Sequence, residues 1–300
     1  MNIHTLDLNY QNIPRATAAY LVVGPTGPVL VETGPASTLP ALKARLAEHG
    51  YTPSDVRHVL VTHIHLDHAG AAGWWAQQGA QVDVHHAGAR HLVDVSRLLA
   101  SAKRIYGSAM EQLWGKTLPA PAERVRALHD GETVQAEGLT FTALATPGHA
   151  RHHLVYILGG LAFTGDVAAV RMPGSDLISL PAPPPEFDLE TWQATLARLL
   201  DLNLSALYLT HYGAVEDARQ HLQGLSALLD ESAEFVRARM QAGVERDEIV
   251  EQYLDWNRQR ARAHGFSKSD SKQYETANPM FMSVDGLMRY WRKRGEGDSG

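Results

Sequence analysis

The stretch Thr62-His63-Ile64-His65-Leu66-Asp67-His68-Ala69-Gly70 places three imidazoles and one carboxylate within six consecutive positions. Neutral imidazole nitrogen is a common ligand of divalent metal ions, and a carboxylate adds a hard oxygen ligand. A solvated loop has no physical reason to gather so many histidines in so short a segment. The stretch therefore predicts a metal-binding site.

The residues before this cluster predict where it lies in the fold. Residues 58–62 are β-branched and apolar without polar alternation, which is typical of a strand buried on both faces. In an extended continuation of that strand, His63, His65 and Asp67 point to one side, and His68 points elsewhere. The small residues 69–73 allow a tight turn into a helix. Ligands on two sides of a turn can hold two ions.

The pattern His63-x-His65-x-Asp67-His68 resembles the signature of the metallo-β-lactamase superfamily of metal-dependent hydrolases. That family has three further ligands downstream, each at the end of a strand. The matching segments here are Ala145-Thr146-Pro147-Gly148-His149, Phe163-Thr164-Gly165-Asp166 and Leu209-Thr210-His211-Tyr212-Gly213. The resemblance covers roughly residues 15–220 and implies an α/β fold, a four-layer αββα sandwich.

The resemblance also implies how the ligands are shared between two divalent ions. One ion is held by His63, His65 and His149, and the other by Asp67, His68 and His211, with Asp166 bridging them. Zinc is the expected metal, although nitrogen and oxygen ligands also allow iron or manganese. Where the family usually shows Asp-Thr-Gly, this chain has Glu32-Thr33-Gly34. The supporting role of the usual aspartate behind the metal ligands therefore does not transfer directly to the longer Glu32 side chain.

The function implied by the resemblance is a dinuclear hydrolase that uses a metal-bridging hydroxide to cleave an acyl bond, either a thioester or a lactone. Asp67 is expected to orient that hydroxide, and Tyr212 to donate a hydrogen bond. The segment from Gly148 to His153 is similar to the hydroxyacylglutathione hydrolase (glyoxalase II) form of the motif, where His153 is expected to support the ligands. The tail shows no recognisable basic set for glutathione itself.

Three other functions remain open from the sequence. A phosphodiesterase or nuclease would need additional basic and phosphate-binding motifs, and the extra nuclease domain is not visible between Asp166 and His211. A mononuclear-iron redox enzyme of the same fold retains much of the same motif. A binding module that has lost hydrolysis would be expected to lack a ligand, and none is missing.

The composition bounds the class of protein. The 300 residues are 44% hydrophobic and 20% charged, with a formal net charge of −6, which suits one large globular domain with a smaller appendage. The mild acidity argues against a nucleic-acid partner, and the absence of cysteine excludes a thiolate metal site. Without a leader-like start or a long apolar stretch, we expect a cytoplasmic protein with a small-molecule substrate, no membrane contact and a possible homodimer.

Local patterns predict the remaining elements and domains. Residues 1–220 are the expected catalytic domain, with a helical insertion at about 87–121 that either covers the active-site mouth or only packs outside, and 221–300 form a helical extension. Arg171, Met172 and the insertion are the expected substrate contacts, and Arg151 a possible anion contact. Strands are predicted at 19–23, 29–32, 82–85, 139–145, 154–158, 161–164 and 207–209, and helices at 37–49, 189–200, 216–242, 247–263 and 276–294.

Overall fold

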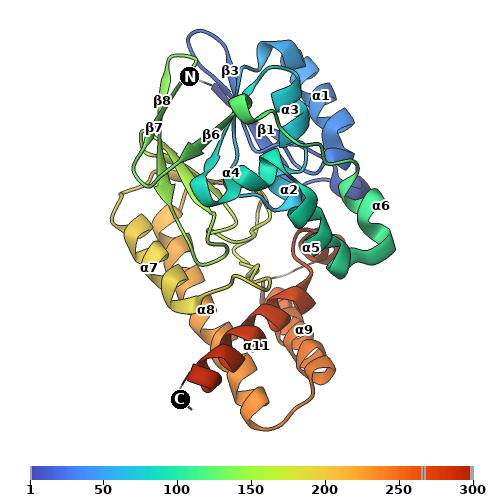
Figure 1. Cartoon of the computed structure of the whole chain (residues 1–300). Coiled ribbons are helices and arrows are strands. Elements are labelled where there is room, and N and C mark those ends of the chain that lie inside the picture. The colour runs from blue at the N-terminus through green and yellow to red at the C-terminus, as the bar shows by residue number, and fades with distance from the viewer. Residues whose placement is uncertain (1, 265, 267, 298–300) are drawn as a thin grey trace.

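The computed structural model describes residues 2–264, 266 and 268–297, and at its centre are two six-stranded sheets (Figure 1). The strands of the first sheet lie side by side in chain order: β1 (Asn2–Asp7), β2 (Ala18–Val23), β3 (Pro28–Val31), β4 (His58–Leu60), β5 (Gln81–His85) and β6 (Val125–Leu128). The second sheet also follows chain order: β7 (Thr133–Ala136), β8 (Leu139–Ala145), β9 (Leu154–Leu158), β10 (Leu161–Gly165), β11 (Ala206–Leu209) and β12 (Gly213–Val215).

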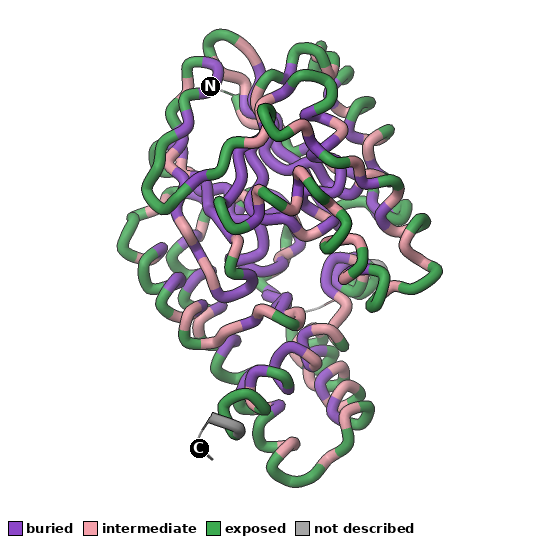
Figure 2. The backbone as a smooth tube through the Cα atoms, in the orientation of Figure 1, coloured by how far each residue is buried: buried purple, intermediate pink, exposed green. Residues whose placement is uncertain are grey.

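Large apolar side chains join the two sheets face to face. The rings of Tyr20 on β2 and Phe163 on β10 have centroids 5.5 Å apart. The Tyr20 hydroxyl donates a hydrogen bond to the Leu209 carbonyl, and the Tyr156 hydroxyl donates to the Val61 carbonyl at 3.1 Å. Figure 2 shows the buried backbone concentrated in this central layer. The burial of these side chains stabilises the sandwich.

Helices cover the outer faces of both sheets and extend beyond them. They are α1 (Leu39–Glu48), α2 (Leu66–Ala69), α3 (Ala72–Gln77), α4 (His86–Val93), α5 (Ser96–Tyr106), α6 (Met110–Trp114), α7 (Leu189–Leu200), α8 (Ala218–Gln241), α9 (Arg246–Ala263), α10 (Lys268–Ala277) and α11 (Met280–Gly297). α1 and α3 share an apolar cluster with the first sheet, and α7 and α8 share one with the second. The predicted four-layer αββα fold with C-terminal helices is therefore confirmed.

Most of the elements predicted from the sequence are present, with differences in the strands and in the C-terminal helices. Strands β1, β6, β7 and β12 were not predicted; β1, for example, is largely exposed or half-buried at a sheet edge, so its apolar pattern is weak. The predicted helix 276–294 begins instead at Met280, and a further helix, α10, precedes it. Residues 1, 265, 267 and 298–300 of the predicted domains lie outside the described residues.

The C-terminal helix α11 lies against the proline-rich connector of residues 181–185. A Cβ atom on Gly286 would lie 1.9 Å from the carbonyl oxygen of Ala182, so only glycine permits this approach. The Ser283 hydroxyl donates to the Leu180 carbonyl at 2.7 Å. Helices α8, α9 and α11 also share one apolar cluster with α7, β10 and β11. The domain boundary at residue 220 and the homodimer stay predictions.

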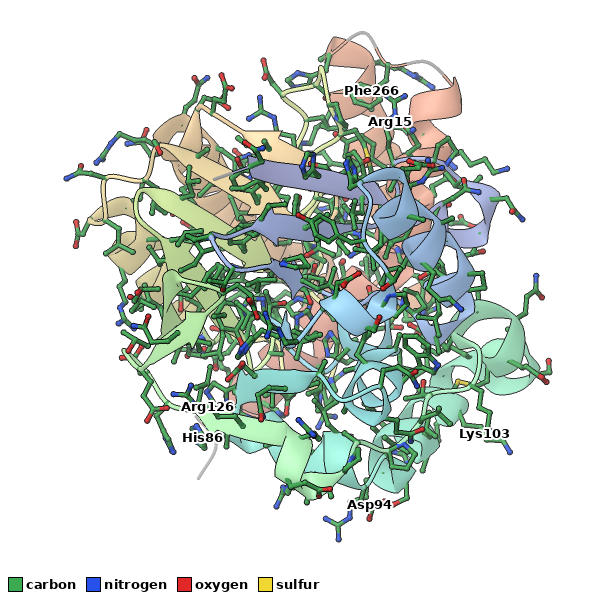
Figure 3. The ribbon with its side chains drawn as sticks, turned by 90° about the horizontal axis from the view of Figure 1, so that it is seen from above. Arg15, His86, Asp94, Lys103, Arg126 and Phe266 are labelled. Carbon is green, nitrogen blue, oxygen red and sulfur yellow. The ribbon has the colours of Figure 1, made fainter. Side chains whose placement is uncertain are left out.

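The C-terminal part also contacts the start of the chain. The Gln273 side chain of α10 donates a hydrogen bond to the Pro14 carbonyl at 2.8 Å, and Figure 3 shows Arg15 and Phe266 at the same edge of the molecule. This contact joins two segments that are far apart in sequence, and residues near each of them, Gln11 and Thr276, line the cavity described below. None of the described helices has the length and apolarity that crossing a membrane requires.

Candidate metal centre and active site

The predicted metal ligands meet at one edge of the sandwich, beyond the ends of four strands. After β4 the chain passes through His63 and His65 into α2, which carries Asp67 and His68. The segments that follow β8, β10 and β11 supply the other three predicted ligands: His149, Asp166 and His211. Strand ends of two facing sheets therefore position the whole set.

The extended path expected as far as Asp67 is wrong, because a helical turn already begins at Leu66. The Gly70 N–H donates to the Leu66 carbonyl at 3.1 Å, and a Cβ on Gly70 would lie 2.3 Å from that oxygen. The turn places Asp67 beside His68 rather than beside His65.

The first group of potential ligands consists of His63, His65 and His149, whose facing nitrogens lie within 4.8 Å of one another. Nδ1 of His65 lies 2.9 Å from Nε2 of His63 and 3.0 Å from Nε2 of His149. Nδ1 of His63 lies 3.0 Å from the Thr62 hydroxyl, and Nδ1 of His149 lies 2.8 Å from the Pro181 carbonyl. Because a carbonyl only accepts, His149 carries its proton on Nδ1 and directs an Nε2 lone pair into the cluster.

The second group consists of Asp67, His68 and His211, again with donor atoms within 4.8 Å of one another. Nε2 of His211 lies 3.5 Å from Oδ2 of Asp67, and Nε2 of His68 lies 3.7 Å from the same oxygen. Nδ1 of His211 donates to the Ala16 carbonyl at 2.7 Å. This outer hydrogen bond fixes the ring in the orientation that exposes Nε2 to the cluster.

Asp166 lies between the two groups. Its Oδ1 lies 3.2 Å from Nε2 of His68, and its Oδ2 lies 3.4 Å from Nε2 of His149. The Asp166 N–H donates to Nε2 of His153 at 3.2 Å, so His153 supports the loop that carries the carboxylate. Asp166 also forms a third potential ligand group with His63 and His68, and so contacts rings of both groups.

Glu32 follows β3 and extends a carboxylate to the back of the cluster. The side chain is buried, and the backbone has a φ of 67°, an uncommon conformation for a residue other than glycine. Its Oε1 accepts from the Thr62 hydroxyl at 2.5 Å and from the Thr210 hydroxyl at 3.3 Å, and lies 3.2 Å from Nδ1 of His68. The longer carboxylate therefore orients His68 from outside the cluster.

The two groups differ in their electrostatics. Burial lowers the pKa of His63 well below its ordinary value and lowers that of His65 to about 4. Burial acts in the same direction on His68, but the carboxylates of Asp166 and Asp67 outweigh it and hold the His68 pKa well above its ordinary value. Burial would raise the pKa of Asp67, but the charge on His68 lowers it to about 2. The first group thus offers neutral nitrogen, and the second adds anionic oxygen.

The residues of the cluster fit divalent metal ions. Three buried atoms at its centre have no hydrogen-bond partner among the described residues: Nε2 of His68, Nε2 of His211 and Oδ1 of Asp166. Buried polar atoms are normally satisfied, so the convergence of these unpartnered lone pairs fits the binding of a cation. Nitrogen and oxygen donors suit zinc, iron or manganese.

A cavity of about 390 Å³ opens onto this cluster. Its floor includes His65, Asp67, His149, Asp166 and His211, and these are the only titratable Asp, Glu, His, Lys or Arg side chains among the described residues that line it. The walls come from α5, α6, the N-terminal segment, the 181–185 connector and residues 276–282. The walls are therefore uncharged and mainly apolar, whereas the floor is highly polar.

The helical insertion forms one wall of this cavity rather than an outer packing layer. Ile105 and Tyr106 of α5 and Trp114 of α6 line it, and the rings of Trp114 and Tyr10 stack with centroids 5.7 Å apart. The Tyr106 hydroxyl donates to the sulfur of Met282 at 3.5 Å. This contact joins the insertion to α11 across the site.

Several other candidate residues lie away from the cavity. Tyr212 is not among its lining residues; burial and the charge of Asp7 raise the Tyr212 pKa to about 12. The Arg171 guanidinium binds Asp217 at 2.9 Å, and Met172 is buried in a separate apolar cluster. Arg171 and Met172 therefore serve the packing of the fold in this structure.

Arg151 and three histidines that lie at the end of strand β5 or just after it, outside the ligand motifs, also have other surroundings. His85 accepts a hydrogen bond from the Ala87 N–H at 3.1 Å, and His86 stacks on His129 with ring centroids 4.2 Å apart, at the periphery in Figure 3. His91 belongs to none of the potential ligand groups found in the described part of the chain. Arg151 pairs with Glu186 at 3.0 Å.

Sequence reasoning missed the parts of the wall that come from the chain ends. Tyr10 and Gln11 of the N-terminal segment and residues 276–282 carry no motif, and nothing in their composition connects them to the metal cluster. Phe281 was assigned only to a helix, yet 41% of it is exposed to solvent where it borders the cavity. Only the structure shows that this aromatic residue of the C-terminal helix borders the cavity.

Solved structures and curated proteins show the same architecture. A metallo-beta-lactamase family protein from Thermus thermophilus, TTHA1429, has a TM-score of 0.73 at 23% identity, covering 98% of this chain and 94% of that one. The metallo-beta-lactamase fold-containing protein ST1585 of Sulfurisphaera tokodaii is 22% identical over 85% of this chain and 94% of its own length. These similarities extend beyond the ligand motifs to most of the chain.

Two further relatives carry names that state an activity. Thioesterase pkgB of Emericella nidulans is 28% identical over 67% of this chain and 47% of its own length. A hydroxyacylglutathione hydrolase of Xanthomonas campestris is 31% identical over 46% of this chain and 40% of its own length. The model of the family described as the metallo-beta-lactamase superfamily matches residues 12–211, which include all seven predicted ligands. The chain therefore belongs to the metallo-beta-lactamase superfamily.

Proposed function

We propose that this hydrolase cleaves a thioester or lactone with the help of two divalent metal ions, most simply zinc. One observation supports this function above the others. The metal cluster forms the floor of a cavity whose described lining contains no lysine or arginine. An uncharged acyl group fits such a cavity without leaving a charge unpaired.

In this proposal the seven side chains supply one ligand set for each ion, as the two groups already described, and Asp166 lies between them. When bound, the ions polarise the substrate carbonyl and make water a nucleophile near neutral pH. The chain's own contribution is to orient: Pro181 and Ala16 fix the rings of His149 and His211 through their carbonyl oxygens. These contacts hold the donor nitrogens in place before substrate arrives.

Asp67 has a further role in this proposal. Its side chain is 23% exposed, whereas that of Asp166 is 6% exposed, and both line the cavity. Asp67 is therefore the carboxylate of the cluster that an entering water reaches more easily. It can accept a hydrogen bond from that water and aim its oxygen at the acyl carbon.

The same cavity disfavours phosphoryl transfer. A phosphodiester brings a negative charge, and enzymes that bind such groups surround them with arginine, lysine or backbone N–H donors. Here the described walls offer apolar side chains such as Leu98, Ile105 and Phe281 instead. The number of donors also favours two ions, since zinc takes about four ligands per site. The thioesterase name of pkgB agrees with an acyl substrate.

A hydrolysis panel tests the proposal. Purified protein supplied with zinc should cleave an apolar acyl thioester or lactone and leave bis(4-nitrophenyl) phosphate intact. His68→Ala should abolish the activity, whereas His86→Ala, which alters a histidine outside the ligand groups, should retain it. Phosphodiester cleavage without acyl cleavage would overturn the proposal.

A further inference from the structure

A second cavity, also of about 390 Å³, borders the same connector as the first. Pro185 lines both cavities, and Gly148 lines the second while the adjoining His149 lines the first. The second cavity is lined by four cationic side chains: Arg151, Arg289, Lys293 and Arg294. We call it the basic pocket.

The acidic groups around the basic pocket already have partners. Glu186 accepts from the Arg151 guanidinium at 3.0 Å, and Asp188 accepts from the Thr191 N–H at 2.9 Å at the start of α7. Glu190 accepts from the Tyr290 hydroxyl at 2.6 Å and from the Arg294 guanidinium. Each of the three carboxylates is thus compensated by a cation, a hydroxyl or a helix N-terminus.

Two cations of the pocket remain uncompensated. Arg289 and Lys293 are exposed and stand one helical turn apart on α11, and their side chains make no hydrogen bond or ion pair with any other residue that the structure describes. The acidic residue one turn before Arg289 is Asp285, but both of its oxygens bind Arg246 at 2.8 Å. The pocket therefore keeps a positive charge that can attract an anion.

Helix α11 runs from one cavity to the other. Phe281 and Met282 in its first turn line the cavity over the metal ligands, and Arg289 and Lys293 further along line the basic pocket. The seven residues from Met282 to Arg289 correspond to about 10 Å along a helix. In Figure 1 the helix extends from the region below α5 towards the C-terminus. A single extended ligand can follow this helix from an apolar end to an anionic end.

We propose that the basic pocket binds the phosphate of a phosphopantetheine-type thiol carrier whose acyl group lies in the apolar cavity. The inference rests on the proposed hydrolase function and selects the thioester over the lactone. Water adds its oxygen to the acyl carbon, the carbon–sulfur bond breaks, and the products are a carboxylic acid and the free thiol. The pantetheine arm separates phosphate from sulfur, as the two cavities require.

Ligand binding tests the pocket without any catalytic step. Coenzyme A, 4′-phosphopantetheine and pantetheine share the same thiol and arm, and only pantetheine lacks phosphate. Calorimetric titration should show both phosphorylated thiols binding roughly tenfold more tightly than pantetheine, with a difference that shrinks as salt is added. Equal affinity for all three would overturn the proposal.

Variants assign the effect to α11. Arg289→Gln with Lys293→Gln should remove the preference for coenzyme A and leave pantetheine binding unchanged. Arg292→Gln is the matched control, because Arg292 is an exposed cation of the same helix that does not line the pocket. Loss of preference in the control, or its retention in the double variant, would contradict the assignment.

Kinetics separate this inference from the function on which it rests. The double variant should raise KM for an acyl-coenzyme A and leave KM for the same acyl group on pantetheine unchanged. If the enzyme hydrolyses the pantetheine thioester but shows no preference for phosphorylated thiols, the proposed hydrolase function stands. Only the proposal that the basic pocket binds phosphate would then be overturned. Comparable affinities for phosphopantetheine and coenzyme A would show that the protein recognises the phosphate on the pantetheine arm. Tighter binding of coenzyme A would show that the protein also recognises the nucleotide phosphates.

Discussion

The two cavities along α11 have the same volume, about 390 Å³, but opposite linings. The first has neutral walls over a floor of histidine and aspartate, and the second is lined by four cations and two carboxylates, with Arg289 and Lys293 left without an acidic partner among the described residues. Both border the connector of residues 181–185, which α11 holds through Ser283 and Gly286. The difference separates two tasks: one cavity places a neutral acyl group over the metal ligands, and the other offers charge to a different part of the substrate.

The largest expected effect concerns the floor of the first cavity. Glu32→Gln should lower zinc affinity roughly 10- to 100-fold, because an amide replaces the carboxylate that orients His68 from behind. Competition with a chromophoric chelator measures this. Coenzyme A binding in the basic pocket should be unchanged. Unaltered zinc affinity would show that Glu32 does not support the metal centre.

A smaller effect is expected at the wall of the first cavity. Ile105→Ala and Phe281→Ala should each raise KM for an octanoyl thioester by roughly fivefold to tenfold, since each buried methylene contributes about 0.8 kcal/mol. The acetyl thioester, which does not reach the wall, should show little change. Leu202→Ala is the control, because Leu202 is also an exposed large apolar residue but lines neither cavity.

A third substitution should change stability and leave both cavities intact. Asp83 of β5 is buried, and neither of its oxygens has a hydrogen-bond partner among the described residues. Burial raises its pKa to about 7 from an ordinary value of 3.8, although the Arg126 guanidinium, 3.8 Å from Oδ1, acts in the opposite direction. The folded protein therefore binds the proton of the Asp83 carboxyl more tightly than the unfolded chain does. As pH rises from about 4 to about 7, ionisation of Asp83 lowers the free energy of unfolding by a growing amount. Above that range the decrease reaches about 4 kcal/mol.

Asp83→Asn should accordingly increase the free energy of unfolding near pH 8 more than near pH 5. Urea denaturation at the two pH values measures the difference. Hydrolysis and coenzyme A binding should match those of the unaltered protein, which makes this variant a control for effects of global stability. A gain that is the same at both pH values would contradict the raised pKa of Asp83.

The cluster of potential metal ligands at the first cavity was predictable from sequence, whereas the walls of the cavity were not. His63, His65, Asp67 and His68 follow a buried strand within six residues, so local pattern and family resemblance together identify them. The path of the backbone was less predictable. The helical turn at Leu66 depends on the close packing of Gly70, and the alternation of side chains along a strand gives no sign of such a turn. The resemblance predicted the order of the ligands and their division into two groups, but the helical turn that begins at Leu66 needed coordinates.

Contacts between distant segments explain what the sequence could not show. Tyr10, Tyr106 and Met282 meet at one cavity although they are far apart in the chain, and none belongs to a motif. Nor did any pattern indicate that Arg289 and Lys293 would lack acidic partners, because Asp285 stands at the spacing of a helical ion pair but binds Arg246. Tertiary competition for partners decides which charges remain available to a ligand.

The measurement that tests the central claim most directly is a zinc titration of chelator-treated protein, with hydrolysis of an apolar acyl-pantetheine thioester as the readout. Two groups of ligands with Asp166 between them predict that activity rises until two zinc ions are bound per chain and then stays constant. Full activity with one ion, or no thioester hydrolysis at any zinc content, would contradict a two-metal acyl hydrolase.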